Sequence, residues 1–120
     1  SRITGVSDKA ISVGEASDIV ARKIVIDNVS IGAVSKDGSR LELENSVITN
    51  YSNYALMSYI KKPEYGAGEL VAVNLDLNQS DNIAKSQAGS VILIDGIAVT
   101  TEEFNVDRLY DGLMKSGIKK

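Results

Sequence analysis

The stretches SDIVARKIVIDNV (residues 17–29) and SRLELENSVITNY (residues 39–51) decide the fold, because equivalent residues in them stand 22 positions apart. The matched pairs are Ser17 with Ser39, Ile19 with Leu41, Ala21 with Leu43, Ile26 with Ile48 and Asn28 with Asn50. A sequence repeat of this length indicates stacked, similar structural units.

Two later segments continue the series. GELVAVNLDLNQ (residues 68–79) places Leu70 over Leu41 and Asn74 over Asn45, and GSVILIDG (residues 89–96) places Val91 over Leu70 at an offset of 21. We therefore expect an all-β fold, a right-handed parallel β-helix of about four coils of about 22 residues, spanning about residues 11–99. An antiparallel sandwich would explain the strands but not this recurring register.

The alternation of apolar and polar residues predicts which side chains face the interior. Leu41 and Leu43 are expected to point inward and Glu42 and Glu44 outward, because successive strand residues face opposite sides. Stacking also predicts amide ladders at two corners, one pairing Asn28 with Asn50 and the other pairing Asn45 with Asn74.

One step of the repeat is longer than the others. Leu41 and Leu70 are 29 residues apart, so seven extra residues are expected near KKPEYGA (residues 61–67), which includes the only proline of the chain. Proline is tolerated in a loop because no ladder hydrogen bond is lost there. This stretch is therefore predicted to be an insertion into one coil.

Composition sets further bounds. The 120 residues suffice for a single domain, and 43% hydrophobic but only 5% aromatic residues predict an aliphatic core. A net charge of −3 with interspersed signs argues against nucleic-acid binding. The chain has no Cys and no His, and no apolar run approaches the roughly 18 residues of a membrane span, so we expect no membrane insertion.

The two ends of the coil stack pose an edge problem. Residues 101–116 are expected to form a helix that caps the last coil, with Thr100 or Thr101 as N-cap and an apolar face of Phe104, Leu109, Leu113 and Met114. A dimerisation helix is the alternative. Residues 1–6 are too few to cover the first coil, which predicts further coils upstream or self-association through this open end.

The phrases DKAISVGEAS, IGAVSKDGS and YIKKPEYGAG resemble the C-terminal coils of bacterial right-handed parallel β-helix repeat proteins, of the pectate-lyase-like superfold. The resemblance covers roughly residues 7–110. It implies a secreted or cell-surface protein whose β-helix is a scaffold in contact with polysaccharide. Fold alone does not establish function.

Enzymes that share this superfold use recognisable combinations of residues. Hydrolases of this kind combine aspartates with Gly-His-Gly and Arg-Ile-Lys elements, neither of which occurs here. Lyases use calcium-binding acidic residues, for which Glu15 and Asp37, at equivalent points of successive coils, are weak metal candidates. We expect no catalytic residues and no cofactor.

The insertion is the best candidate for a binding site. Tyr59, Lys61, Lys62 and Tyr65 offer aromatic faces for sugar rings and ammonium groups for uronate or sulfate, although the tyrosines could instead pin the loop to the coil wall. The predicted function is a non-catalytic scaffold or adhesive module that binds polysaccharide. The alternative is the trailing coils of a polysaccharide lyase or hydrolase whose active site lies upstream.

Overall fold

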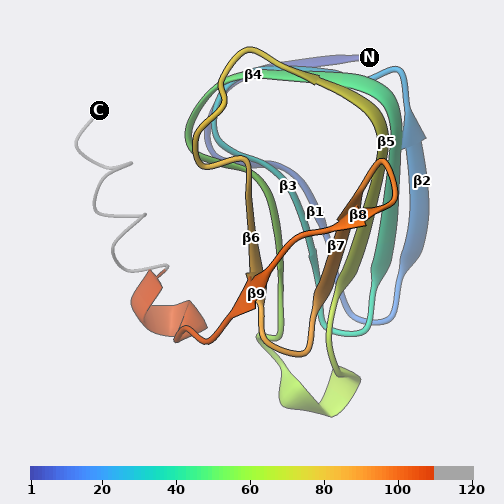
Figure 1. Ribbon diagram of the computed structural model, residues 1–120, viewed down its shortest axis with the longest axis vertical. Coiled ribbons are helices and arrows are strands. Elements are labelled where there is room, and N and C mark those ends of the chain that lie inside the picture. Colours follow the sequence, from blue (N-terminus) through green and yellow to red (C-terminus); the bar gives the residue numbers. More distant parts are fainter. Residues whose placement is uncertain (110–120) are drawn as a thin grey trace.

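The computed structural model describes residues 1–109. These residues form an all-β structure that winds in successive circuits, with one short 3-10 helix, Pro63–Tyr65, and a helix that begins at Val106 (Figure 1). The strands are β1 (Arg2–Val13), β2 (Asp18–Arg22), β3 (Val25–Lys36), β4 (Arg40–Tyr59), β5 (Glu69–Leu77), β6 (Ala84–Gln87), β7 (Val91–Ile94), β8 (Ile97–Ala98) and β9 (Thr101–Glu102).

Most strand pairs are parallel and join each circuit of the chain to the next. The sheet order is β1-β3-β4-β5-β7-β8, with β2 and β6 paired to β4, and among the strands of residues 1–109 only the β7–β8 pair is antiparallel. We call each circuit a rung: residues 2–24, 25–46, 47–75, and the last from residue 76. Figure 1 looks along the stack, so the rungs overlie one another.

The predicted 22-residue register is confirmed over much of the chain. Ile19 pairs with Leu41 and Ala21 with Leu43, and Leu41 in turn pairs with Leu70. The alignment of the last segment was off by one, because Val91 pairs with Glu69 at an offset of 22 and Ile92 occupies the place above Leu70. Pairing also begins earlier than residue 11, since Arg2 already pairs with Val25.

The extra residues of the third rung are divided between two places. The offset between β3 and β4 rises from 22 at Val29–Tyr51 to 23 at Ile31–Tyr54, so one residue enters at a β-bulge. It then rises from 23 at Lys36–Tyr59 to 29 between Arg40 and Glu69, which places six extra residues in the loop between β4 and β5. The insertion is thus where the sequence predicted it, but one of its seven residues lies in the bulge.

Several corners between strands contain an asparagine whose backbone has positive φ, a conformation that asparagine tolerates better than most residues. Asn45 (φ 50°) and Asn74 (φ 55°) stack, and the Asn74 amide donates to Asn45 Oδ1 at 2.8 Å, which confirms that ladder. The other corner differs from the prediction. There the side-chain amide of Asn50 donates to Asp27 Oδ1 at 2.7 Å, and not to the predicted partner Asn28. The Asn78 amide donates to Asn50 Oδ1 at 3.1 Å, so this ladder runs toward the last rung.

The core is aliphatic and enclosed by the rungs. Leu41, Leu43, Leu70 and Ile92 are at most 1% exposed, and Glu42 and Glu44 lie on the outer face, which confirms the predicted alternation. A second apolar cluster lies on the outside of the wall formed by β3 and β4. It comprises Ile31, Val34, Met57, Tyr59 and Val106, with Tyr54, Phe104 and Leu109 packed against it.

The tail follows a different path from the one predicted. Thr101 lies in β9, which pairs with β6, and the helix begins at Val106 with Asn105 as its N-cap, since Asn105 Oδ1 accepts from the Arg108 amide at 2.9 Å. Phe104, Val106 and Leu109 pack on the outer wall, not over the end of the last rung. Leu113 and Met114 of the predicted helix 101–116 lie outside the described residues.

Candidate functional site

The insertion and the corner beneath it form the candidate site. The loop of residues 60–68 projects from the body at the bottom of Figure 1 and contains the 3-10 helix Pro63–Tyr65. Two hydrogen bonds close it, from the Tyr65 amide to the Lys62 carbonyl (3.0 Å) and from the Gly66 amide to the Pro63 carbonyl (3.2 Å). The loop is therefore an ordered turn on a rigid wall, where binding residues are often found.

Asp37 anchors this loop. Its side chain is only 1% exposed, and its Oδ1 accepts the backbone amides of Lys61 (2.7 Å) and Lys62 (2.6 Å). The Gly38 amide adds bonds to the Gly66 and Ala67 carbonyls at 3.1 and 3.0 Å. A buried carboxylate needs such donors, and here the donors come from the inserted residues.

Glu15 stands at the point of the first rung that corresponds to Asp37, as the register between residues 13 and 18 requires. Both residues have φ of 55°, but only Glu15 faces solvent, where its carboxylate pairs with Lys62 Nζ. Glu15 and Asp37 thus occupy equivalent points of successive rungs, and both carboxylates bind nitrogen donors of the loop. No group of three or more potential metal ligands lies among residues 1–109.

Tyr59 requires a correction. The sequence placed it with the solvent-facing loop residues, whereas its side chain is 0% exposed within the second apolar cluster. The tail residues Phe104 and Val106 pack against this cluster and cover the wall from outside. Tyr65 is 43% exposed and is the aromatic side chain that the loop presents to solvent.

The structure adds two lysines to the predicted pair Lys61 and Lys62. Lys36 ends β3, next to Tyr59 in the register, and its side chain lies across Gly14 of the rung below. Burial lowers the pKa of Lys36, and the charges of Lys61, Lys9 and Lys62 lower it further, against the opposing effect of Asp37. We call Lys9, Lys36, Lys61 and Lys62 the lysine cluster.

The members of the lysine cluster differ in their partners. Lys9 Nζ lies 2.9 Å from Asp8 Oδ2, and the hydrogen bond and charge of Glu15 raise the pKa of Lys62. Lys36 and Lys9 were not predicted, because both lie outside the insertion. The repeat could have pointed to Lys36, since the 22-residue register places it directly before the corner over which the insertion folds.

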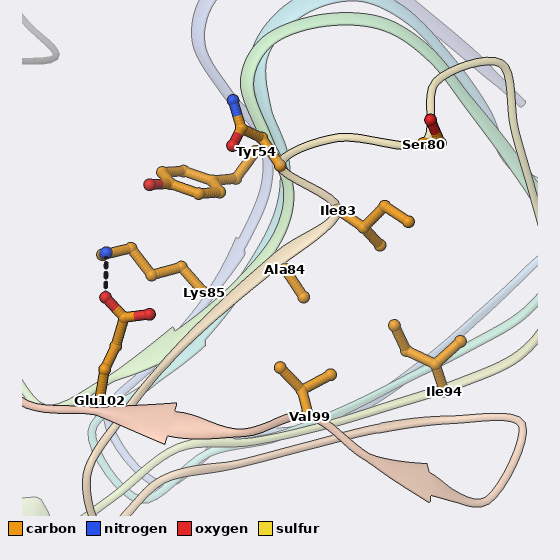
Figure 2. A pocket seen from close by; sticks show the side chains of 9 residues that line it. Tyr54, Ser80, Ile83, Ala84, Lys85, Ile94, Val99 and Glu102 are labelled. Carbon is orange, nitrogen blue, oxygen red and sulfur yellow. Dashed lines mark hydrogen bonds and ion pairs between the residues drawn. The ribbon is translucent and has the colours of Figure 1, made fainter.

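A concave feature lies at the end of the last rung. This hollow of about 480 Å³ has an apolar floor of Ile83, Ala84, Ile94 and Val99, whose side chains point into it in Figure 2. Its rim carries the Lys85–Glu102 ion pair at 2.5 Å, drawn as a dashed line.

The charges at this rim are engaged within the chain. Lys85 Nζ lies 5.0 Å from the centre of the Phe104 ring and 5.6 Å from that of Tyr54. Burial acts to lower the pKa of Lys85, but the hydrogen bond and charge of Glu102, together with Tyr54, outweigh it and raise the pKa. The Lys85 ammonium thus ties β6 to β9 and the tail.

Comparison of the chain with protein-family models, curated protein sequences and solved structures finds no match in any of the three. Among the described residues no helix is long and apolar enough to cross a membrane.

Proposed function

We propose that the chain is a right-handed parallel β-helix that serves as a non-catalytic scaffold of a secreted or cell-surface protein and binds acidic polysaccharide through the insertion. Parallel rungs at a 22-residue register support the β-helix, and parallel crossovers are right-handed in nearly all proteins. The lysine cluster supports the ligand class, because ammonium groups pair with uronate or sulfate.

The observation that carries this proposal is the crowding of cations around Lys36. Burial and, after it, the charges of Lys61 and Lys9 disfavour its protonated form and lower its pKa. An anion bound between Lys36 and Lys61 would relieve this cost. Tyr65, exposed on the same loop, offers a ring face to an adjacent sugar.

We predict that oligogalacturonate binds the protein and that its methyl ester, which lacks the charge, does not. Changing Lys36 and Lys61 together to Gln should weaken binding about tenfold, since each exposed ion pair contributes roughly 0.2–1 kcal/mol or somewhat more when partly buried. Isothermal titration calorimetry measures this loss.

The control variant is Lys23→Gln. Lys23 is an exposed lysine at a different corner, so Lys23→Gln lowers the net charge by one, as Lys36→Gln or Lys61→Gln alone does, without touching the lysine cluster. Equal losses for Lys23→Gln and for either cluster lysine would show a nonspecific charge effect. Equal binding of the acid and its ester would contradict the proposed ligand class.

Binding should also depend on pH in a defined direction. An anion binds protonated Lys36, whose pKa in the free protein lies below that of an ordinary lysine. As pH rises through this lowered pKa, the charge is lost and affinity should fall, earlier than for a surface lysine. In Lys36→Gln this early fall should be absent, because the group whose pKa is lowered has been removed. Identical titration-derived pH profiles for both proteins would exclude Lys36 from the site.

A further inference from the structure

The corner beside the insertion is lined by buried serines. Ser35, Ser58 and Ser86 form one column through three successive rungs, since Ser35 pairs with Ser58 and Ser58 pairs with Ser86. All three residues are 0% exposed. A column of hydroxyl groups stands out in a largely aliphatic interior, because a buried hydroxyl is costly unless it is hydrogen-bonded.

A second column faces the first across the same corner. The strand register places Ser39, Gly68 and Ser90 in it, one above the other. The serines of both columns come from a turn with the pattern S-x-x-G-S, which occurs as SKDGS at residues 35–39 and as SQAGS at residues 86–90. In the third rung the insertion replaces this turn, so Gly68 stands where the other two rungs have the second serine of the pattern.

The turn of the second rung satisfies its own hydroxyl groups. Ser35 Oγ lies 2.8 Å from Ser39 Oγ, and Ser39 Oγ donates to the Val13 carbonyl at 2.9 Å. The same pattern in the last rung is not closed in this way. Among the described residues, neither Ser86 Oγ nor Ser90 Oγ has a hydrogen-bond partner, although both serines are at most 3% exposed.

The third rung adds another unmet hydroxyl. Ser58 Oγ has no partner among residues 1–109, and the residue across the corner from it, Gly68, has no side chain that could supply one. Because Ser58 and Ser86 are neighbours in the register, all three unmet hydroxyls lie on two adjacent rungs of one corner. An unmet buried hydroxyl destabilises the folded state, so a partner shared by the three would be favourable.

We propose that this corner binds a water molecule that bridges the hydroxyl groups of Ser58, Ser86 and Ser90. A buried water typically makes about three hydrogen bonds to protein groups that are otherwise unsatisfied, which matches the three hydroxyls. Water both donates and accepts, as a serine hydroxyl does, so it can bond to each of them in either direction. The site lies inside the wall, and it does not depend on whether the insertion binds polysaccharide.

Ser86→Ala tests the bridge by the sign of its effect on stability. If Ser86 bonds to the water, alanine removes a hydrogen bond and should raise the unfolding equilibrium constant about fivefold. If the hydroxyl is instead unmet, alanine removes a buried polar group and the protein should become more stable. Urea denaturation measures the change. Ser12→Ala is the control, because Ser12 is an exposed serine of β1 and reports the effect of alanine in a strand.

Magnetic relaxation dispersion of the water oxygen detects long-lived buried water directly. Changing Ser86 and Ser90 together to Ala removes two of the three hydroxyls, and a site with a single polar partner does not hold a water. We therefore expect the wild-type chain to hold one long-lived water more than this double variant.

Two results would overturn the water site: an equal water count in the wild-type chain and the double variant, or a gain in stability with Ser86→Ala beyond that of the Ser12→Ala control. A lower count together with a loss of stability supports it. Ser58→Ala repeats the stability test at another hydroxyl of the bridge and should be destabilising as well. Circular dichroism establishes that each variant is folded.

Discussion

Gly68→Ala is expected to lower the free energy of unfolding by about 4 kcal/mol or more, the range of severe overpacking and backbone displacement. Gly68 is buried where the insertion returns to the wall and begins β5. A Cβ there would lie 2.2 Å from the Ser35 carbonyl oxygen and 2.6 Å from its carbon. Both are backbone atoms of β3, so no side-chain rotation can relieve the contact.

The Ser35 corner has little freedom to move away. Ser39 Oγ lies 2.8 Å from Ser35 Oγ and donates to the Val13 carbonyl at 2.9 Å, and the Lys36 amide donates to Ser39 Oγ at 3.0 Å. Movement of β3 would break these buried hydrogen bonds, each worth roughly 1 kcal/mol or more. The substitution thus strains the third rung against two earlier rungs.

Gly66→Ala is the matched control within the same loop. Gly66 has φ of 88° and ψ of −165°, a backbone conformation that essentially only glycine adopts, so alanine should cost about 1–3 kcal/mol in backbone strain. A Cβ added there would meet no other atom within 4 Å, so no steric contact adds to this cost. Urea denaturation of both variants gives the two free energies. A cost for Gly68→Ala no larger than that for Gly66→Ala would contradict the close approach of β3 and the returning loop.

The register of the rungs could be predicted from sequence because the core demands it. A shift of one residue would move Leu41 and Leu43 from the interior to solvent, so the apolar pattern defines which residues pair. The bulge near residue 52 could not be located this way, since a single extra residue on an outward corner leaves the neighbouring inward positions unchanged.

The sequence also contained a sign that the outer face of the β3–β4 wall is covered, but the alternation of apolar and polar residues does not reveal it. Residues 29–35 are all buried, and Ala55 to Tyr59 likewise, so these stretches are covered on both faces. Strands buried on both sides read as continuous apolar runs. Such a run indicates that something covers the outside, but it does not say which segment. The open end of the coil stack is the stronger signal in the sequence, and it predicts the tail as a cap on the last rung.

The candidate site was predictable in position but only partly in composition. The repeat located the insertion and aligned Glu15 with Asp37, because both follow from residue spacing. The different roles of these two acids depend on the path of the loop, which brings the Lys61 amide to Asp37. The path of the loop cannot be predicted from the spacing of residues in the sequence.

Asp37→Ala is the second large effect, with an expected cost of about 3 kcal/mol in the free energy of unfolding. The variant removes the carboxylate that accepts the Lys61 and Lys62 amides, and these are two part-buried hydrogen bonds to a charged group, each worth about 1.5–3 kcal/mol before water replaces part of the loss. Asp37→Asn should cost less, because its amide oxygen can still accept and asparagine tolerates the φ of 55°.

Glu15→Ala separates the lost anchor from backbone strain. Glu15 has the same φ of 55° at the equivalent point of the first rung, and its exposed side chain bonds only the end of Lys62, so this variant reports the cost of alanine in that conformation. Amide hydrogen exchange then gives the local result: the Lys61 and Lys62 amides should exchange much faster in Asp37→Ala and keep their protection in Glu15→Ala. Unchanged protection in Asp37→Ala would mean that the Asp37 carboxylate does not hold the loop. In that case the lysines of the insertion would owe their position to the 3-10 helix and the Gly38 hydrogen bonds alone.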